Sequence, residues 1–134
     1  MQGIPKTIYS HRRWLLLAGV ALFAAALAAT HLPPEDVPNF RAGDKTLHVI
    51  GYFVLAAFSW GVLWAYGAPT LRRLLALAAF LPVWAAADEL TQPFFRRTAD
   101  LDDWAADMIG CAAAIALAQL AALAWGRLRD KAKS

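Results

Sequence analysis

Cysteine and charge are both scarce in this chain of 134 residues, and each shortage excludes a class of protein. The single cysteine, Cys111, excludes an internal disulfide framework and any zinc site built from several cysteines. Charged residues make up 17% of the chain, whereas a typical soluble domain has about 25%. Hydrophobic residues make up 60%, and the mean hydropathy is +0.44. This composition indicates an integral membrane protein.

Several common catalytic and binding motifs are also missing. The chain has no HExxH, no EF-hand loop, no GxSxG and no glycine-rich phosphate loop. It shows no internal repeat, which transporters of inverted-repeat architecture contain. The formal net charge of +3 comes with basic residues that flank apolar segments, where they set membrane orientation. We therefore expect no binding to nucleic acid.

Apolar segments predict an all-α, integral membrane four-helix bundle that forms a single domain over residues 1–134. The first segment also fits a cleaved signal peptide, because it follows a short basic start. A polar connection with three prolines, residues 31–45, separates the first segment from the second. The helices are expected at about residues 14–30, 46–66, 71–91 and 104–125.

Basic flanks give the expected orientation, because lysine and arginine near helix ends prefer the cytoplasm. Three basic residues precede the first predicted helix, two lie at Arg72 and Arg73, and four follow the last helix. Four spans return the chain to the side on which it starts. We expect a multi-pass protein of the cytoplasmic (inner) membrane with both termini cytoplasmic. The stretch Asp88–Asp107 and the start of the second helix then meet at the outer face.

Polar residues recur at helical spacing on three of the predicted helices near that face. Lys45 borders the stripe on the second helix, and Gly110 continues the stripe on the fourth, where a small residue permits close helix approach. Because lipid offers no hydrogen bonds, these stripes are expected to face one another inside the bundle. The stripes are Asp44, His48 and Tyr52 in the second helix, Asp88 and Gln92 in the third, and Asp100, Asp103 and Asp107 in the fourth.

These residues predict a polar pocket at the outer membrane face. The candidate catalytic residues are those that exchange protons most readily: His48, Glu89 and Asp88. The residues expected to bind substrate, by an anionic group above all, are Lys45, Arg97, Arg96, Gln92 and Tyr52. The residues expected to orient these groups are Asp44, Asp100, Asp103, Asp107 and Gly110. A divalent metal, whose identity the sequence leaves open, would be held by His48, Asp88, Glu89 and Asp107.

The order of these motifs resembles the VanZ-like family, small bacterial membrane proteins named after an accessory protein of glycopeptide resistance. The resemblance rests on Asp44-Lys45-x-x-His48-x-x-x-Tyr52, Asp88-Glu89-x-x-Gln92, Arg97, Asp100, Asp103 and Gly110, and covers residues 40–115. It implies a membrane location and a link to the cell envelope and to teicoplanin susceptibility, but no established reaction. The chain departs from the family at Asp107, where Asn is more usual, and at Pro93–Arg96, where the family tends towards a Gly-containing turn.

Three functions stay open on the sequence. The leading one binds or modifies an envelope component, either an anionic lipid or a lipid-linked cell-wall precursor. The alternative is a non-enzymatic binding or partner module whose charges form a closed structural network. The third, proton or cation movement, needs a polar path inward, whereas Ile50–Trp64 offers only Tyr52 and Ser59. A pocket open to water or to the outer leaflet, with an unpaired acid and His48 facing it, would favour an enzyme. A fully paired, dry cluster with no cavity would favour the non-enzymatic module.

Overall fold

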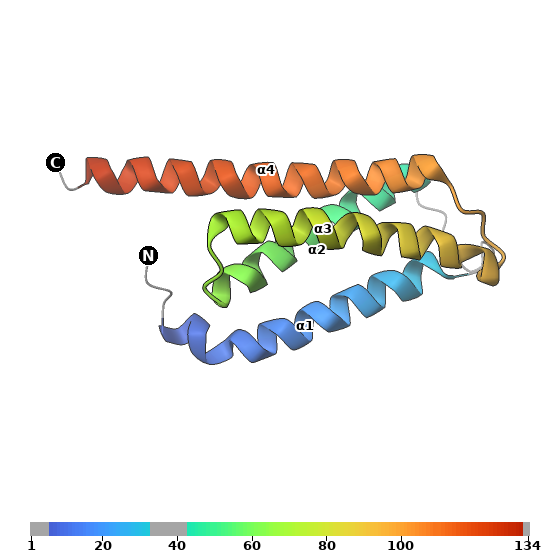
Figure 1. The fold of residues 1–134 in the computed structure, drawn as a ribbon, viewed down its shortest axis with the longest axis horizontal. Coiled ribbons are helices and arrows are strands. Elements are labelled where there is room, and N and C mark those ends of the chain that lie inside the picture. Colours follow the sequence, from blue (N-terminus) through green and yellow to red (C-terminus); the bar gives the residue numbers. More distant parts are fainter. Residues whose placement is uncertain (1–5, 33–42, 133–134) are drawn as a thin grey trace.

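Four long α-helices run alternately up and down along a common axis (Figure 1). A computed structural model describes residues 6–32 and 43–132. The elements are α1 (Lys6–Thr30), α2 (Asp44–Ala65), α3 (Thr70–Thr91), the short 3-10 helix η2 (Gln92–Phe95) and α4 (Leu101–Lys131). Each of the four α-helices is long and apolar enough to cross a membrane. The all-α fold and the multi-pass membrane character are confirmed.

The helix ends differ from the predicted ranges. α1 begins at Lys6 rather than near residue 14, and α4 continues to Lys131 rather than 125. Both extensions are rich in polar and basic residues, so hydropathy alone does not reveal them. α2 begins at Asp44, two residues before the predicted range, so that Asp44 and Lys45 lie in its first turn. Most of the expected connection lies outside the described residues, including Pro33, Pro34, Glu35, Asp36, Pro38 and Arg41, and so does Lys133.

The core of the bundle forms where α2 meets α3 and α4. The buried apolar residues of this core are Tyr52, Leu55, Ala56 and Trp60 in α2, Leu77, Leu81 and Ala85 in α3, and Cys111 and Ala114 in α4. Pro82 lies inside α3, and its carbonyl oxygen accepts a hydrogen bond of 3.2 Å from the indole Nε1 of Trp104 in α4. Cys111 is buried among these residues and packs as a small side chain.

Gly110 lies at the closest approach of α4 to α2. A Cβ atom at this position would collide with the carbonyl oxygen of Val49 and lie 2.9 Å from the backbone nitrogen of Phe53. Small residues at such crossings let two helix backbones approach each other in a membrane. The absence of a side chain here brings the polar faces of α2 and α4 together.

The two ends of the bundle differ in character. The start of α1, the end of α4 and the connection between α2 and α3 lie at one end, whereas η2 and the start of α2 lie at the other (Figure 1). The basic flanks therefore gather at the first end, and the polar stripes gather at the second. The site described below lies at this second end.

Candidate functional site

His48 lies at the centre of a buried group of carboxylates contributed by α3 and α4. Its Nδ1 atom is 2.9 Å from Oδ1 of Asp107 and 4.0 Å from Oε1 of Glu89. Its Nε2 atom is 4.0 Å from Oδ2 of Asp103. All four side chains are buried, and Asp107 is 0% exposed. We call these four residues the His48 cluster.

Glu89 is fixed by two groups that follow it in the chain. Nε2 of Gln92 donates a hydrogen bond of 3.0 Å to Oε1 of Glu89, and the backbone N–H of Asp100 donates one of 3.0 Å to Oε2. The side chain of Asp100 caps α4 by accepting from the backbone N–H of Asp102 at 2.8 Å. Asp100 thus orients Glu89 through its backbone, while its carboxylate stabilises the start of α4.

The turn between η2 and α4 is made without glycine. Arg96 ends η2 with a φ of 63°, the left-handed conformation that glycine adopts most readily. Arg96 therefore takes the backbone conformation for which the family tends to use glycine, and its side chain is exposed. This turn brings Asp100 back against Glu89.

Asp88 belongs to a second polar group, between α1, α2 and α3. Thr30 Oγ1 donates a hydrogen bond of 2.7 Å to Oδ1 of Asp88, and the Tyr52 hydroxyl donates one of 3.3 Å to Oδ2. Nδ1 of His31 lies 3.5 Å from Oδ1, and Nε2 of the same ring lies 2.9 Å from the Thr91 hydroxyl. Both oxygens of Asp88 are therefore engaged by side chains outside the His48 cluster, and Asp88 falls outside the metal-capable groups described below.

Thr30 and His31 were missed by the sequence interpretation, which placed His31 in a polar connection and Thr30 at the end of an apolar run. The available signal was a Thr-His pair at the end of the apolar segment, at the membrane end that also carries Asp88. Neither residue carries a formal charge at neutral pH, so a search for charged residues passes over both.

The basic residues lie at the rim of the site. Nζ of Lys45 is 2.8 Å from Oδ2 of Asp102, and both side chains are exposed, so this ion pair contributes little stability. Nη2 of Arg97 lies 3.5 Å from Oδ2 of Asp44, and the Arg97 side chain is only 15% exposed. Arg97 therefore reaches the interior, whereas Lys45 remains on the surface.

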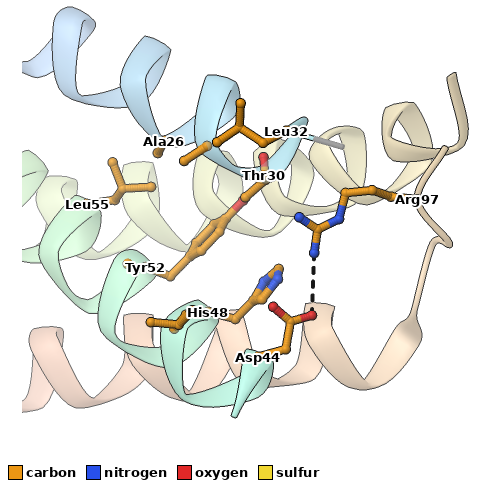
Figure 2. Close-up of a pocket in the computed structure, with 11 residues that line it drawn as sticks. Ala26, Thr30, Leu32, Asp44, His48, Tyr52, Leu55 and Arg97 are labelled. Atoms are coloured by element: carbon orange, nitrogen blue, oxygen red, sulfur yellow. Dashed lines mark hydrogen bonds and ion pairs between the residues drawn. The ribbon is translucent and has the colours of Figure 1, made fainter. Parts of the chain in front are cut away.

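A cavity of about 280 Å³ lies between α1 and α2, beside His48 (Figure 2). Its polar end is formed by Thr30, Asp44, His48, Tyr52 and Arg97. Its apolar walls are Ala26, Ala29, Leu32, Leu47, Gly51 and Leu55. Of the residues expected to bind substrate, Tyr52 and Arg97 border the cavity. Gln92 is hydrogen-bonded to Glu89 and is not part of the lining. Lys45 and Arg96 are also not part of the lining.

Two overlapping groups of side chains have the composition and spacing of a metal site. One group is His48, Glu89 and Asp107, and the other is Asp44, His48 and Asp103. The potential ligand atoms within each group all lie within 4.8 Å of one another. Within the part of the chain that the structure describes, Oδ2 of Asp107 is a buried oxygen with no hydrogen-bond partner.

Comparison with known proteins identifies the family. A model of the VanZ/LLP1 family matches residues 32–122. Searches of the curated proteins and of the solved structures found no match. The matched residues include the entire His48 cluster and Arg97, whereas Thr30 and His31 precede them. The match covers more than half of the chain and confirms the resemblance seen in the sequence, so the protein belongs to the VanZ/LLP1 family.

Proposed function

We propose that this protein binds the anionic headgroup of a lipid or lipid-linked cell-wall precursor in the cavity between α1 and α2. The observation that carries the proposal is the division of the cavity lining into a polar end with Arg97 and apolar walls. A membrane lipid has the same division between headgroup and chain. A site bordered by apolar transmembrane helices suits such a ligand better than a freely soluble one.

Arg97 is the proposed anchor for the anionic group. Its contact with Asp44 is long at 3.5 Å, and a guanidinium carries five N–H donors. The remaining donors suit the parallel pair of hydrogen bonds that arginine forms with phosphate or carboxylate. His48 borders the same end of the cavity and adds a second polar group.

Chemical turnover of the bound headgroup is the catalytic form of this proposal. His48 faces the cavity, and Asp107 lies 2.9 Å from its Nδ1 atom, the arrangement of a base and the carboxylate that orients it. Glu89 is the second proton-handling candidate. Asp88, with both oxygens engaged by Thr30 and Tyr52, is better suited to joining α1 to the bundle.

Filling the cavity and removing its cation are expected to weaken lipid binding in different ways. A Cβ atom at Gly51 meets nothing within 4 Å, so Gly51→Leu should fit the helix and occupy the cavity. We expect at least about a tenfold loss of affinity, equivalent to about 1.4 kcal/mol, for fluorescent phosphatidylglycerol and phosphatidylcholine alike. Arg97→Gln should instead remove the preference for phosphatidylglycerol. Titration of each lipid into protein in nanodiscs gives both quantities.

Matched controls exist for both variants. Gly61→Leu adds the same side chain to α2 at a position with nothing within 4 Å and outside the cavity lining. Arg72→Gln removes the same charge from the opposite end of the bundle, where Arg72 is exposed. Both controls should bind as the unaltered protein does. Unchanged lipid binding by Gly51→Leu would show that the lipid does not bind in this cavity. An unchanged preference for phosphatidylglycerol in Arg97→Gln would show that Arg97 does not bind the anionic headgroup.

The proposal places the cavity at the outer face of the cytoplasmic membrane, with both termini in the cytoplasm. It is supported by the gathering of the basic flanks at the opposite end of the bundle (Figure 1). A reporter active only outside the cytoplasm should be active when inserted after Thr98 and inactive when inserted after Ala68. Activity of the reporter after Ala68 would reverse the orientation.

The link to teicoplanin susceptibility that the family resemblance implies belongs to the same proposal. A protein that holds or alters an envelope lipid at the outer face changes what a glycopeptide meets at the cell surface. A non-enzymatic partner module is the second candidate, favoured by the bonds that tie Glu89 to Gln92 and to the start of α4. On that alternative, Gly51→Leu leaves teicoplanin susceptibility unchanged.

A further inference from the structure

We propose that His48, Glu89 and Asp107 form a binding site for one divalent transition-metal ion, Zn²⁺ or Mn²⁺. The site lies beside the lipid cavity and shares His48 with it. Metal binding goes beyond the proposed lipid binding and does not depend on it. It replaces the role of His48 as a base, because the ion would occupy Nδ1 and the proton Nε2. The inference rests on the charge balance of the cluster, on an unpartnered oxygen and on the arrangement of the potential ligand atoms.

The charge balance of the His48 cluster favours a cation. Three buried carboxylates surround a single imidazole, which carries at most one positive charge. Lys45 pairs with Asp102 and Arg97 with Asp44, so neither of these cations neutralises the cluster. Excess buried charge is costly in a membrane, where residues of this kind pair, bind ions or serve function. A divalent ion bound to the neutral imidazole would set two positive charges against the three carboxylates, one more than a single imidazolium supplies.

The unpartnered oxygen is an independent sign of a ligand. Asp107 is 0% exposed, and its Oδ2 atom has no hydrogen-bond partner among the described residues. A buried carboxylate oxygen without a partner loses its hydration at a cost of about 1–3 kcal/mol or more. Oδ1 of the same carboxylate is already 2.9 Å from His48. A metal ion bound by this carboxylate would give Oδ2 of Asp107 the partner that it lacks.

The ligand atoms need only small shifts to surround an ion. Nδ1 of His48 is 2.9 Å from Asp107 and 4.0 Å from Glu89, distances close to those between ligands of one metal ion. Binding through Nδ1 would place the remaining ring proton on Nε2, which faces Asp103 at 4.0 Å. Asp103 would then hold the ring in position, as carboxylates outside the coordination sphere commonly do for metal-bound histidines.

Supporting bonds already fix the second ligand. Glu89 is held by Gln92 and by the backbone N–H of Asp100, so its orientation does not depend on the ion. The donor set of one imidazole and two carboxylates suits Zn²⁺ and Mn²⁺ better than Mg²⁺ or Ca²⁺, which favour oxygen donors alone. The geometry thus points to a first-row transition ion held between α2, α3 and α4.

The test is a direct titration of ZnCl₂ or MnCl₂ into purified, EDTA-stripped protein in detergent without added lipid. Saturable binding of one ion per chain is expected, with a higher melting temperature for the loaded protein. Pulsed electron paramagnetic resonance of the Mn²⁺-loaded protein should show nitrogen coupling from one imidazole, which His48→Gln abolishes. Asp107→Asn and Glu89→Gln should each weaken binding at least tenfold, and Asp103→Asn by about 10–100-fold as an outer partner.

Asp102→Asn is the matched control, because it removes a carboxylate from the same helix but from an exposed pair with Lys45. Its metal affinity should equal that of the unaltered protein. Variants are compared only where gel filtration and circular dichroism show a monodisperse helical protein. Absence of saturable Zn²⁺ and Mn²⁺ binding to the unaltered protein overturns the site. The site is also overturned if Asp107→Asn and Glu89→Gln bind the metal as tightly as the unaltered protein does. It is likewise overturned if the unaltered protein binds Mg²⁺ as tightly as Zn²⁺ and Mn²⁺. Lipid binding is measured separately, in EDTA and therefore without metal. Failure of the metal site can thus be told apart from failure of the lipid cavity.

Discussion

Replacing Gly110 with alanine is expected to destabilise the folded protein by about 2–3 kcal/mol, a large effect for a single added methyl group. The new Cβ atom would collide with the carbonyl oxygen of Val49 and crowd the backbone nitrogen of Phe53. Backbone atoms in the middle of α2 cannot rotate away as a flexible side chain can. The two helices must therefore separate, which also pulls Asp107 away from His48. Thermal unfolding in detergent, followed by circular dichroism, measures the loss.

Gly126→Ala is the control on the same helix, since a Cβ atom there meets nothing within 4 Å. Alanine favours helix over glycine by about 1 kcal/mol, so this variant should be as stable as the original protein or slightly more stable. Wild-type stability of Gly110→Ala would show that α2 and α4 do not approach as closely as described.

The helices and the gathering of polar residues at one end could be predicted because both depend on local patterns. Apolar runs of transmembrane length identify spans, and the spacing of Asp44, His48 and Tyr52 identifies one helix face. Because successive spans alternate in direction, the start of the second helix, the end of the third and the start of the fourth lie on the same side. This reasoning places His48, Asp103 and Asp107 inside the bundle, where they are buried. It also places Asp44 and Asp100 there, and both are exposed because they lie in the first turn and at the cap of their helices.

The division of the acidic residues into two groups could not be predicted, because it depends on how each helix is rotated about its axis. Asp88 and Glu89 are neighbours in sequence, but successive helical residues point about 100° apart. Glu89 therefore faces α4 and the His48 cluster, while Asp88 faces Thr30 of α1 and Tyr52 of α2.

The same limitation applies to the rim of the site. Lys45 follows Asp44 directly but turns to Asp102 on the surface. Arg97, four residues before the first residue of α4, reaches inward to Asp44 because the turn at Arg96 redirects the chain. Closeness in sequence therefore does not predict which basic side chain borders the site. Arg97 does so, and Lys45 does not, because of the direction that the chain takes after η2.

Replacing His48 with alanine in metal-free buffer is expected to destabilise the protein by about 3–5 kcal/mol, the usual result of removing one partner from a buried charged group. The loss leaves Asp107, Glu89 and Asp103 facing one another with no cationic partner within the cluster. It also removes the group closest to Asp107. Chemical denaturation in detergent, monitored by tryptophan fluorescence, gives the difference in free energy of unfolding.

The decisive comparison is the double variant His48→Ala/Asp107→Asn. If electrostatic repulsion causes the loss, neutralising Asp107 should restore about 1–2 kcal/mol, so the double variant is more stable than His48→Ala alone. A simple packing defect predicts the opposite, because two buried side chains would then be altered instead of one. The exposed pair supplies the contrast: in the cycle of Lys45→Ala and Asp102→Asn, the coupling should stay below about 1 kcal/mol. A strong, sign-reversing coupling at His48–Asp107 beside a weak one at Lys45–Asp102 would show that burial, rather than the presence of opposite charges, gives the cluster its energetic weight.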